Sequence, residues 1–338
     1  MVQAPFSAVE NSKKTLPDHG ATTVNSSVSV PTSFSGRDLL GALLVVFLWG
    51  SNFVAMKYGL KQLSPLQLGA LRYLFTALPL VFFVKFPRNG ARWVLLYGLT
   101  QGLGQFGFLF VALEVGMTAS LASVLMQTQV FFTALFAYFI LRERLNRAAQ
   151  LGLICAAVGI ACFAMNYVAP ENLGDAGVSL TTPLGFVLSL CGAAMWAASN
   201  IVIRRAQRAM PEFEPLSLVV WAGAVPIVPF LALSAWFDPV QQQQQWLAIS
   251  WHILLVGAYL GWAATVVGYA LWTSLFKRYP ANRVAPFSLG VPVVGLSAGV
   301  FVLGETITYW QWAGTVCVVL ALAVVLMGPR LRFPRSTH

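Results

Sequence analysis

Two stretches of this sequence place a carboxamide near a tryptophan within a long apolar run. In "FLWGSNFVAMK" Asn52 follows Trp49 by three residues, and in "MWAASNIVIRR" Asn200 follows Trp196 by four. Residues three or four apart share a face of an α-helix, so each stretch presents a ring and an amide together. An amide can donate to a carboxylate, and a Trp ring attracts an ammonium group. The pairs predict a site for a small neutral or zwitterionic solute; the alternative is that both amides only join neighbouring helices.

Polar and aromatic side chains also recur in the middle of other apolar runs. Gln101 and Gln105 lie four residues apart, and Ser288 lies between Pro286 and Pro292, whose rings leave backbone groups free for binding. We expect these side chains to line one central cavity. The predicted substrate-binding residues are Trp49, Asn52, Gln101, Gln105, Gln127, Gln129, Trp196, Asn200, Tyr259, Trp262, Tyr269 and Ser288.

The sequence gives little support to catalysis. Membrane hydrolases and acyltransferases need a nucleophile with a base, or a metal set, but the histidines are His19, His252 and His338, in a tail, at the edge of an apolar run and at the C-terminus. The four cysteines have neither zinc nor redox spacing. Without a Walker motif, ATP is not expected as a driver. We therefore expect no cofactor, no metal and no enzyme activity, with an intramembrane enzyme as the disfavoured alternative.

The composition shows which elements must position these residues. Of the 338 residues, 58% are hydrophobic and 9% are charged, against about 25% charged in soluble domains. Apolar runs of about 20 residues, the length that crosses a bilayer, recur along the chain. The net charge of +10 arises from small groups between these runs, so nucleic acid is not an expected partner. The sequence predicts an all-α integral membrane protein with ten transmembrane helices, at 39–60, 65–85, 93–113, 117–141, 148–168, 183–203, 216–237, 248–276, 283–303 and 309–328.

The basic residues predict the orientation in the bilayer. Ten spans place both termini on one side, and 18 of the 21 Lys and Arg residues fall on that side. Because cytoplasmic loops are enriched in Lys and Arg, we expect both termini in the cytoplasm of a bacterium and the spans in its inner membrane. Residues 1–37 are expected to form a disordered tail, and residues 329–338 a C-terminal tail.

The second half of the chain repeats the first. A shift of 162 residues aligns Glu143 with Glu305 and Phe139 with Phe301 without gaps. Five spans is an odd number, so two five-helix repeats, at 38–168 and 183–328, must have opposite orientations. The charges agree, because "LRERLNR" in the first repeat becomes "LGETITY", without Arg, in the second. Two inverted five-helix repeats are typical of transporters that bind substrate between the repeats.

These patterns resemble a known family, the EamA-type exporters of the drug/metabolite transporter superfamily. The stretches that carry the resemblance are "LWGSNFVAMKYGL", "SPLQLGALRYLF", "FFTALFAYFILRERL" and "RVAPFSLGVPVVGLSAGVFVLGET". Within the family, "YGLTQGLGQFGFLF" and "ASLASVLMQTQVFFT" are most similar to exporters of O-acetylserine and cysteine. Many relatives have Pro where Val130 stands, so a symmetrical gate is in doubt.

The resemblance implies export of amino acids or related small metabolites by alternating access, through a cavity made by spans 1, 3, 4, 6, 8 and 9. Export of aromatic amino acids or cationic toxic compounds is the main alternative, and a passive channel is another. The expected partners are a small-molecule substrate and the lipid bilayer. The oligomeric state stays open, and a monomer is compatible with the sequence.

Charged residues in or beside the spans are assigned structural or gating roles, together with Pro286 and Pro292. Arg72 is expected to snorkel or to bind carbonyl groups rather than substrate, because span 2 is otherwise apolar. Glu143 and Glu305 are expected to cap helices or form ion pairs. Only Glu114 is placed to carry a proton, at the exposed outer end of span 3. We therefore expect facilitated export without obligatory proton coupling.

Overall fold

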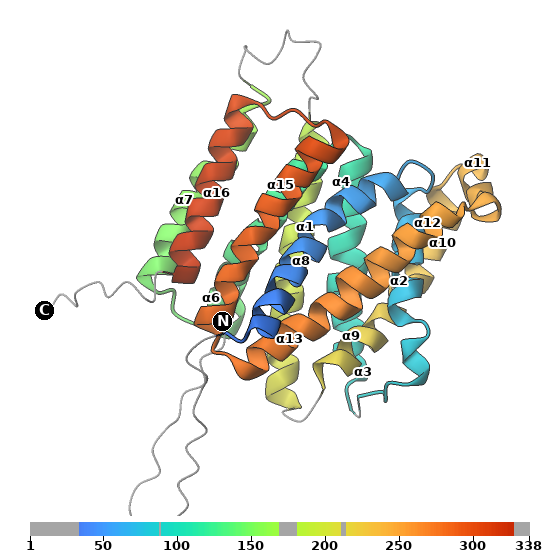
Figure 1. The fold of residues 1–338 in the computed structure, drawn as a ribbon, viewed down its shortest axis with the longest axis horizontal. Coiled ribbons are helices and arrows are strands. Elements are labelled where there is room, and N and C mark those ends of the chain that lie inside the picture. The colour runs from blue at the N-terminus through green and yellow to red at the C-terminus, as the bar shows by residue number, and fades with distance from the viewer. Residues whose placement is uncertain (1–33, 88, 169–180, 211–213, 328–338) are drawn as a thin grey trace, which may run out of the picture.

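The computed structural model describes residues 34–87, 89–168, 181–210 and 214–327. The predicted disorder of most of the N-terminal tail and the predicted C-terminal tail at 329–338 lie outside these residues. Throughout the described ranges the regular structure is helical, without a strand, and ten helical segments are long and apolar enough to cross a membrane (Figure 1). The prediction of an all-α integral membrane protein with ten spans in two inverted repeats is confirmed, while the repeat boundaries stay predictions.

Most spans are built from more than one helical segment. In chain order the helices of the spans are α1 (Gly36–Gly59); α2 (Pro65–Ala77); α3 (Ala91–Tyr97) and α4 (Gly107–Glu114); α5 (Ala119–Leu125) and α6 (Gln129–Leu141); α7 (Arg147–Met165); α8 (Pro183–Ala209); α9 (Pro215–Ala224) and α10 (Ile227–Phe237); α12 (Trp251–Ala258) and α13 (Gly268–Arg278); α15 (Gly290–Leu303); and α16 (Tyr309–Met327). The short helices α11 (Val240–Gln243) and α14 (Ala281–Val284) lie in connections.

The helix starts follow from the local sequence. The side chain of Ser64 accepts a hydrogen bond from the backbone N–H of Gln67, and the side chain of Gln67 accepts one from the backbone N–H of Ser64, so the two residues form a capping box at α2. Thr182 caps α8 in a similar way. Pro65 and Pro183 occupy the first turns of these helices, where a missing N–H costs nothing.

The packing of the helices repeats when the two halves are exchanged. Helix α1 packs on α15, and its counterpart α8 packs on α6. Helix α1 also packs on α13, as α8 packs on α4. The pairs α2 with α9–α10, and α7 with α16, join equivalent spans, and α7 and α16 run side by side at one edge of the molecule (Figure 1). This arrangement agrees with a two-fold relation between inverted repeats.

Small residues bring α7 and α16 close together. A Cβ atom on Gly159 would lie 3.1 Å from the carbonyl oxygen of Gly314, and one on Gly314 would lie 2.9 Å from the carbonyl oxygen of Gly159. The second distance is shorter than real Cβ contacts and the first is tighter than nearly all of them, so a side chain at either position would require the two backbones to shift apart. Small residues at helix contacts are a common way to pack membrane helices, where no hydrophobic effect drives association.

The α-helical geometry is interrupted at matching places in the two repeats. Span 3 contains a π-helical segment at Gly98–Phe106, and span 8 contains one at Tyr259–Val267. Spans 4 and 9 contain 3₁₀ segments, at Met126–Thr128 and Ala285–Leu289. Such interruptions are often found at functional sites, so the middle of these four spans is the natural place to look for one.

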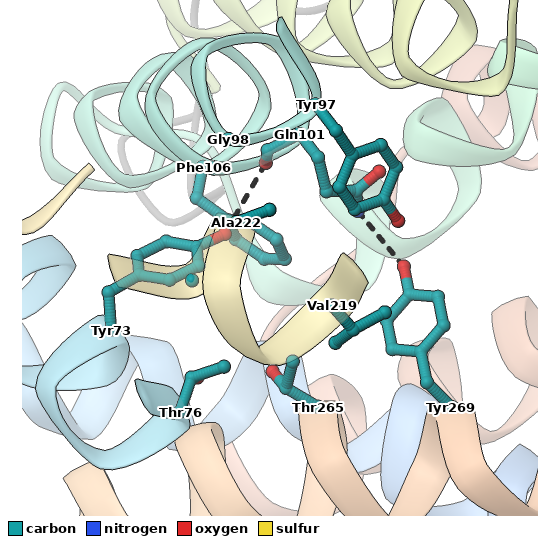
Figure 2. A pocket seen from close by; sticks show the side chains of 12 residues that line it. Tyr73, Thr76, Tyr97, Gly98, Gln101, Phe106, Val219, Ala222, Thr265 and Tyr269 are labelled. Atoms are coloured by element: carbon teal, nitrogen blue, oxygen red, sulfur yellow. Dashed lines mark hydrogen bonds between the residues drawn. The ribbon is translucent and has the colours of Figure 1, made fainter. Parts of the chain in front are cut away.

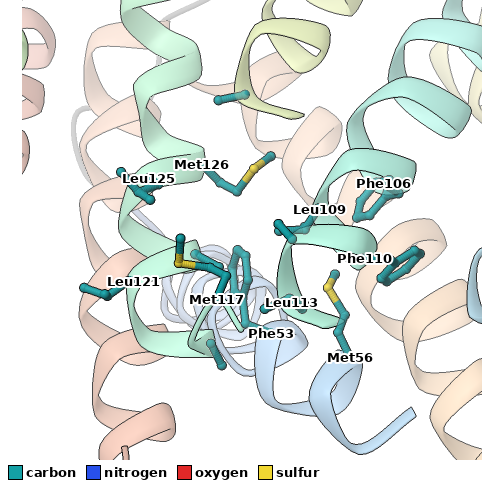
Figure 3. Close-up of a cluster of buried hydrophobic side chains, with 14 of the residues drawn as sticks. Phe53, Met56, Phe106, Leu109, Phe110, Leu113, Met117, Leu121, Leu125 and Met126 are labelled. Carbon is teal, nitrogen blue, oxygen red and sulfur yellow. The ribbon is translucent and has the colours of Figure 1, made fainter. Parts of the chain in front are cut away.

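An apolar core packs one side of this region. Its side chains come from α1, span 3 and span 4 and fill the space between them (Figure 3). The labelled members are Phe53, Met56, Phe106, Leu109, Phe110, Leu113, Met117, Leu121, Leu125 and Met126. Because Phe53 is the neighbour of Asn52 on α1, this packing fixes the height at which Asn52 faces span 2.

Candidate functional site

A buried guanidinium lies at the centre of the candidate site. Arg72, on α2, is 2% exposed. Its Nη1 donates to Oδ1 of Asn52 at 3.2 Å and its Nη2 donates to Oγ1 of Thr265 at 2.8 Å. The guanidinium carbon lies 3.8 Å from the centre of the Phe106 ring. The side chain therefore does not snorkel to the membrane surface, and it binds side chains of α1 and span 8 rather than carbonyl groups.

The positive charge of Arg72 has no described counter-ion. The ion pairs among the described residues join Arg204 and Arg208 to Glu143, and Arg278 to Asp38. The Nε atom of Arg72 is buried and donates to no acceptor. A buried charge without a partner is costly in a protein interior and is rare in a membrane except where function requires it.

Gln101, on span 3, is the centre of a second set of hydrogen bonds near Arg72. The Nε2 atom of Gln101 donates to the hydroxyl of Tyr269 at 2.9 Å, and its Oε1 atom accepts from Oγ of Ser199 at 2.5 Å. The hydroxyl of Tyr73 donates to the backbone carbonyl of Gln101 at 3.4 Å. Gln101 thus connects spans 2, 3, 6 and 8, as Figure 2 shows in part.

A small pocket lies between spans 2, 3, 7 and 8, beside these groups (Figure 2). Its interior is about 20 Å³, which is room for about one water molecule. The lining residues are Tyr73, Thr76, Tyr97, Gly98, Gln101, Gly102, Phe106, Val219, Ala222, Gly223, Thr265 and Tyr269. Spans 2 and 7 contribute five of the twelve lining residues, although the family resemblance implied a cavity made by spans 1, 3, 4, 6, 8 and 9.

A wider pocket adjoins the first one. It has an interior of about 270 Å³ and lies between the start of span 7 and the end of span 8. Glu214 and Lys277 stand among its lining residues, and Val219 and Tyr269 line both pockets. Tyr269 and Val219 therefore belong to the wall that the two pockets share. Lys277 lies on the side that the basic residues predict to be cytoplasmic.

Trp49 and Tyr259 hold α1 against span 8. The Nε1 atom of Trp49 donates to the carbonyl of Ala264 at 2.9 Å, and its ring centre lies 5.4 Å from that of Tyr269. The hydroxyl of Tyr259 donates to the carbonyl of Leu48 at 3.0 Å. Trp49 therefore contacts a residue of the pocket without lining it.

Asn200 belongs to a separate polar group. Its Nδ2 atom donates to Oε1 of Gln129 at 2.8 Å and to Oγ1 of Thr133 at 3.1 Å. The two asparagines of the repeats thus have different partners, a cation for Asn52 and neutral groups for Asn200. Trp196 packs against the apolar core, and its carbonyl accepts from Ser199.

Other residues of spans 3, 4 and 9 that were predicted to bind substrate or to form a gate lie outside the small pocket, and some of them contact neighbouring spans. Gln127 is buried and its Nε2 atom donates to the carbonyl of Ser288 at 3.1 Å, which joins span 4 to span 9. Gln105 is buried and its Oε1 atom has no partner. Pro286 lies in the 3₁₀ segment of span 9, and Pro292 is buried in the first turn of α15.

Trp262 lies away from the pocket. Its side chain is 43% exposed, its Nε1 atom donates to the carbonyl of Leu78 at 3.0 Å, and its ring packs on Phe75. An α-helical pattern places Trp262 on one face with Tyr259 and Tyr269, but these residues span the π-helical segment. A π-helical turn contains more residues than an α-helical turn, so side chains spaced for an α-helix no longer lie on the same face across this segment.

The two matched glutamates lie at helix ends, as expected. Glu305 accepts hydrogen bonds from the backbone N–H groups of Ala119, at 2.7 Å, and Ser120, at 2.8 Å. Glu143 forms ion pairs with Arg204 at 2.9 Å and with Arg208 at 3.1 Å. Both are therefore contacts between spans rather than parts of the pocket.

Among the lining residues that were not predicted, four carry hydroxyl groups: Tyr73, Thr76, Tyr97 and Thr265. Thr76 lies one helical turn after Arg72 and donates to its carbonyl, so a helical wheel centred on Arg72 would have found it. Tyr97 aligns with Tyr259 across the repeats. Among the described residues no cluster of His, Cys, Asp and Glu is arranged to hold a metal.

A membrane fold of ten helices in two inverted repeats, interrupted at the middle around a buried polar pocket, defines a membrane transporter. The EamA-like transporter family matches residues 37–165 and 183–327. The chain belongs to this family. The predicted resemblance to EamA-type exporters of the drug/metabolite transporter superfamily is thereby confirmed.

Two curated relatives are similar over most of their length. A protein of Salmonella typhimurium described as a probable amino-acid metabolite efflux pump is 40% identical over 299 residues, 88% of this chain and 97% of the relative. A protein of Escherichia coli with the same description is 38% identical over 299 residues, with the same coverage. A crystal structure with 19% sequence identity superposes with a TM-score of 0.56 and covers 89% of this chain and 100% of the other, which shows the shared fold.

Proposed function

We propose that this protein exports amino acids or closely related small metabolites, of the O-acetylserine and cysteine kind, from the bacterial cytoplasm. The observation that carries the proposal is the pocket between spans 2, 3, 7 and 8, whose mainly apolar walls also carry hydroxyl, amide and aromatic side chains and no described carboxylate. Such walls suit a small solute with its own polar groups. The descriptions of the two relatives as efflux pumps support the same class of solute.

Transport follows by alternating access between the two repeats. An interior of about 20 Å³ is too small for an amino acid, so the helices around it must separate for substrate to enter. The wider pocket beside Lys277 offers an approach from the predicted cytoplasmic side, and Tyr269 lines both pockets. Gln101 and Thr265, which line the small pocket, lie in the π-helical segments of spans 3 and 8.

Export of aromatic amino acids is the second candidate. Tyr73, Tyr97, Tyr269 and Phe106 supply aromatic walls that would accept a ring. A cationic toxic compound fits less well, because the buried charge of Arg72 repels a cation and no described carboxylate offsets it.

Counterflow in proteoliposomes tests the proposal. Vesicles containing the purified protein are preloaded with an unlabelled amino acid, and uptake of labelled cysteine, O-acetylserine, phenylalanine and a lipophilic cation is followed. We expect saturable counterflow of the small amino acids, and protein-free vesicles provide the control. Saturable counterflow of the cation alone, or of no amino acid, would contradict the proposal.

A further inference from the structure

Arg72 has more donors than its surroundings use. A guanidinium has five N–H groups in a planar fork, and the described partners of the Arg72 guanidinium are Asn52, Thr265 and the hydroxyl of Tyr73. Nε is buried without an acceptor, and the flat face is covered by Phe106. The acceptors are an amide oxygen and hydroxyl groups, all neutral, so the charge of Arg72 is hydrogen-bonded but has no described counter-ion.

Arg72 does not itself line the small pocket, but two of the lining residues, Phe106 and Thr265, contact its guanidinium. A ligand that enters this pocket therefore comes within one side chain of the fork of Arg72, which it reaches when the helices around the pocket separate. Figure 2 shows the hydroxyl groups of Tyr73 and Tyr269 directed at Gln101, on the opposite wall.

The chemistry of the fork selects the ligand. A carboxylate accepts two parallel hydrogen bonds from a guanidinium, which makes this pair stronger and more specific than a contact with a neutral acceptor. A phosphate carries close to two negative charges, and the described structure brings no second cation to this pocket. A group with a single negative charge therefore balances the site.

We propose that Arg72 binds the carboxylate of the transported amino acid. Asn52 and Thr265 hold the guanidinium in position while the site is empty, and the carboxylate supplies the missing counter-charge. This inference rests on the proposed function and specifies it, because it makes the carboxylate the part of the substrate that the protein requires. Solutes whose carboxylate is blocked, such as methyl esters and amides, should be excluded whatever their side chain.

The first arm of the test uses the unaltered protein. Counterflow of labelled cysteine or O-acetylserine in proteoliposomes is challenged with serine, serine methyl ester and serinamide. We expect serine to compete and the two blocked analogues to compete at least about tenfold less well, which is the effect of losing one charge-assisted pair. Equal competition by serine and its methyl ester would overturn the assignment, whereas absence of any amino-acid counterflow would remove the proposed function itself.

The second arm uses variants of Arg72. Arg72→Gln should lose amino-acid counterflow by at least about tenfold, while Arg72→Lys, a point charge without the fork, should retain an intermediate rate. The preference for serine over its methyl ester should disappear in Arg72→Gln. Arg92→Gln, which removes an exposed Arg at the start of span 3, is the matched control.

Thermal unfolding and gel filtration in detergent separate binding from folding. A merely structural Arg72 would lower stability in Arg72→Gln and leave the ratio of serine to ester unchanged, and this result would overturn the proposal. If Arg72→Gln does not fold, Thr265→Val, which removes one acceptor of the guanidinium, replaces it. The expected result is then a reduced preference for serine over the ester, and an unchanged preference would count against the proposal.

Discussion

Glu143 and Glu305 end equivalent helices with the same backbone geometry but bind different partners. Each follows a residue in the left-handed conformation, Arg142 with φ 57° and Gly304 with φ 67°. The backbone N–H of each glutamate donates to the carbonyl six residues earlier, at 3.2 Å in both cases. The helix end is therefore preserved between the repeats, while the carboxylates act differently.

The two carboxylates join different elements. Glu305 reaches the N-terminus of α5, where two backbone N–H groups that have no partner within the helix donate to its carboxylate. Glu143 pairs with the arginines of α8 instead. The side that carries Glu305 is thus fastened between spans 4 and 9, whereas the wider pocket opens on the side of Lys277.

The first prediction concerns the hydrogen bonds between Glu305 and the N-terminus of α5. Glu305→Gln replaces the charge by a neutral amide, and we expect the free energy of unfolding to fall by about 1–2 kcal/mol, because bonds to a charged acceptor are the stronger ones. Glu143→Gln should cost less, since its ion pairs with Arg204 and Arg208 are partly exposed to solvent and such pairs contribute little. Thermal unfolding in detergent measures both. An equal loss of stability in the two variants would show that the bonds to α5 have no special weight.

The second prediction compares the two asparagines. Asn52→Ala removes an acceptor of the Arg72 guanidinium, and we expect counterflow to fall about tenfold. Asn200→Ala removes bonds to the neutral groups of Gln129 and Thr133, and we expect a loss of about fivefold or less. Both variants should keep a folded yield close to that of the parent. Comparable losses in the two would place both asparagines at the substrate.

The third prediction separates two tryptophans that the sequence pattern placed together. Trp262→Leu alters an exposed ring that packs on Phe75, so rate and selectivity should stay close to those of the parent. Trp49→Leu removes a ring beside Tyr269 and should change the ratio of zwitterion to neutral analogue. Counterflow with paired labelled solutes gives this ratio. A strong change in Trp262→Leu would mean that the ring approaches substrate in another state.

The fourth prediction concerns coupling. The acidic residues Asp38, Glu114, Glu143, Glu214, Asp238 and Glu305 all lie at helix ends or in connections. Glu114 is exposed at the end of α4, so no described carboxylate is placed at the pocket to carry a proton. We expect counterflow without dependence on a pH gradient, in the parent and in Glu114→Gln alike. Uphill accumulation driven by a pH gradient and abolished in Glu114→Gln would identify Glu114 as the proton carrier.

The spans could be predicted because insertion into a membrane imposes simple requirements on the amino-acid sequence. Apolar runs of fixed length and the distribution of Lys and Arg depend on the bilayer and not on which helices touch. The opposite orientation of the repeats follows from the number of spans, since an odd number of spans in the first repeat inverts the second. The helix ends at Glu143 and Glu305 were also predictable, because capping is a local property.

The partners of the polar residues could not be predicted in the same way. Arg72 stands among Leu and Ala on α2, so the sequence favours a peripheral helix, yet α2 packs against spans 7 and 8. Which helix supplies Thr265 or Asn52 depends on tertiary packing. The helix face on which Trp262 lies could not be predicted, because nothing in "YLGWAATVV" distinguishes a π-helical segment from an α-helical one.

The contact between Gly159 and Gly314 couples the two halves of the chain. Each glycine leaves the space that the backbone of the other fills, so an alanine at either position forces α7 and α16 apart. A change in one half can then be tolerated only with an adjustment in the other. Although duplicated sequences are free to diverge elsewhere, these two positions remain under a joint mutational constraint.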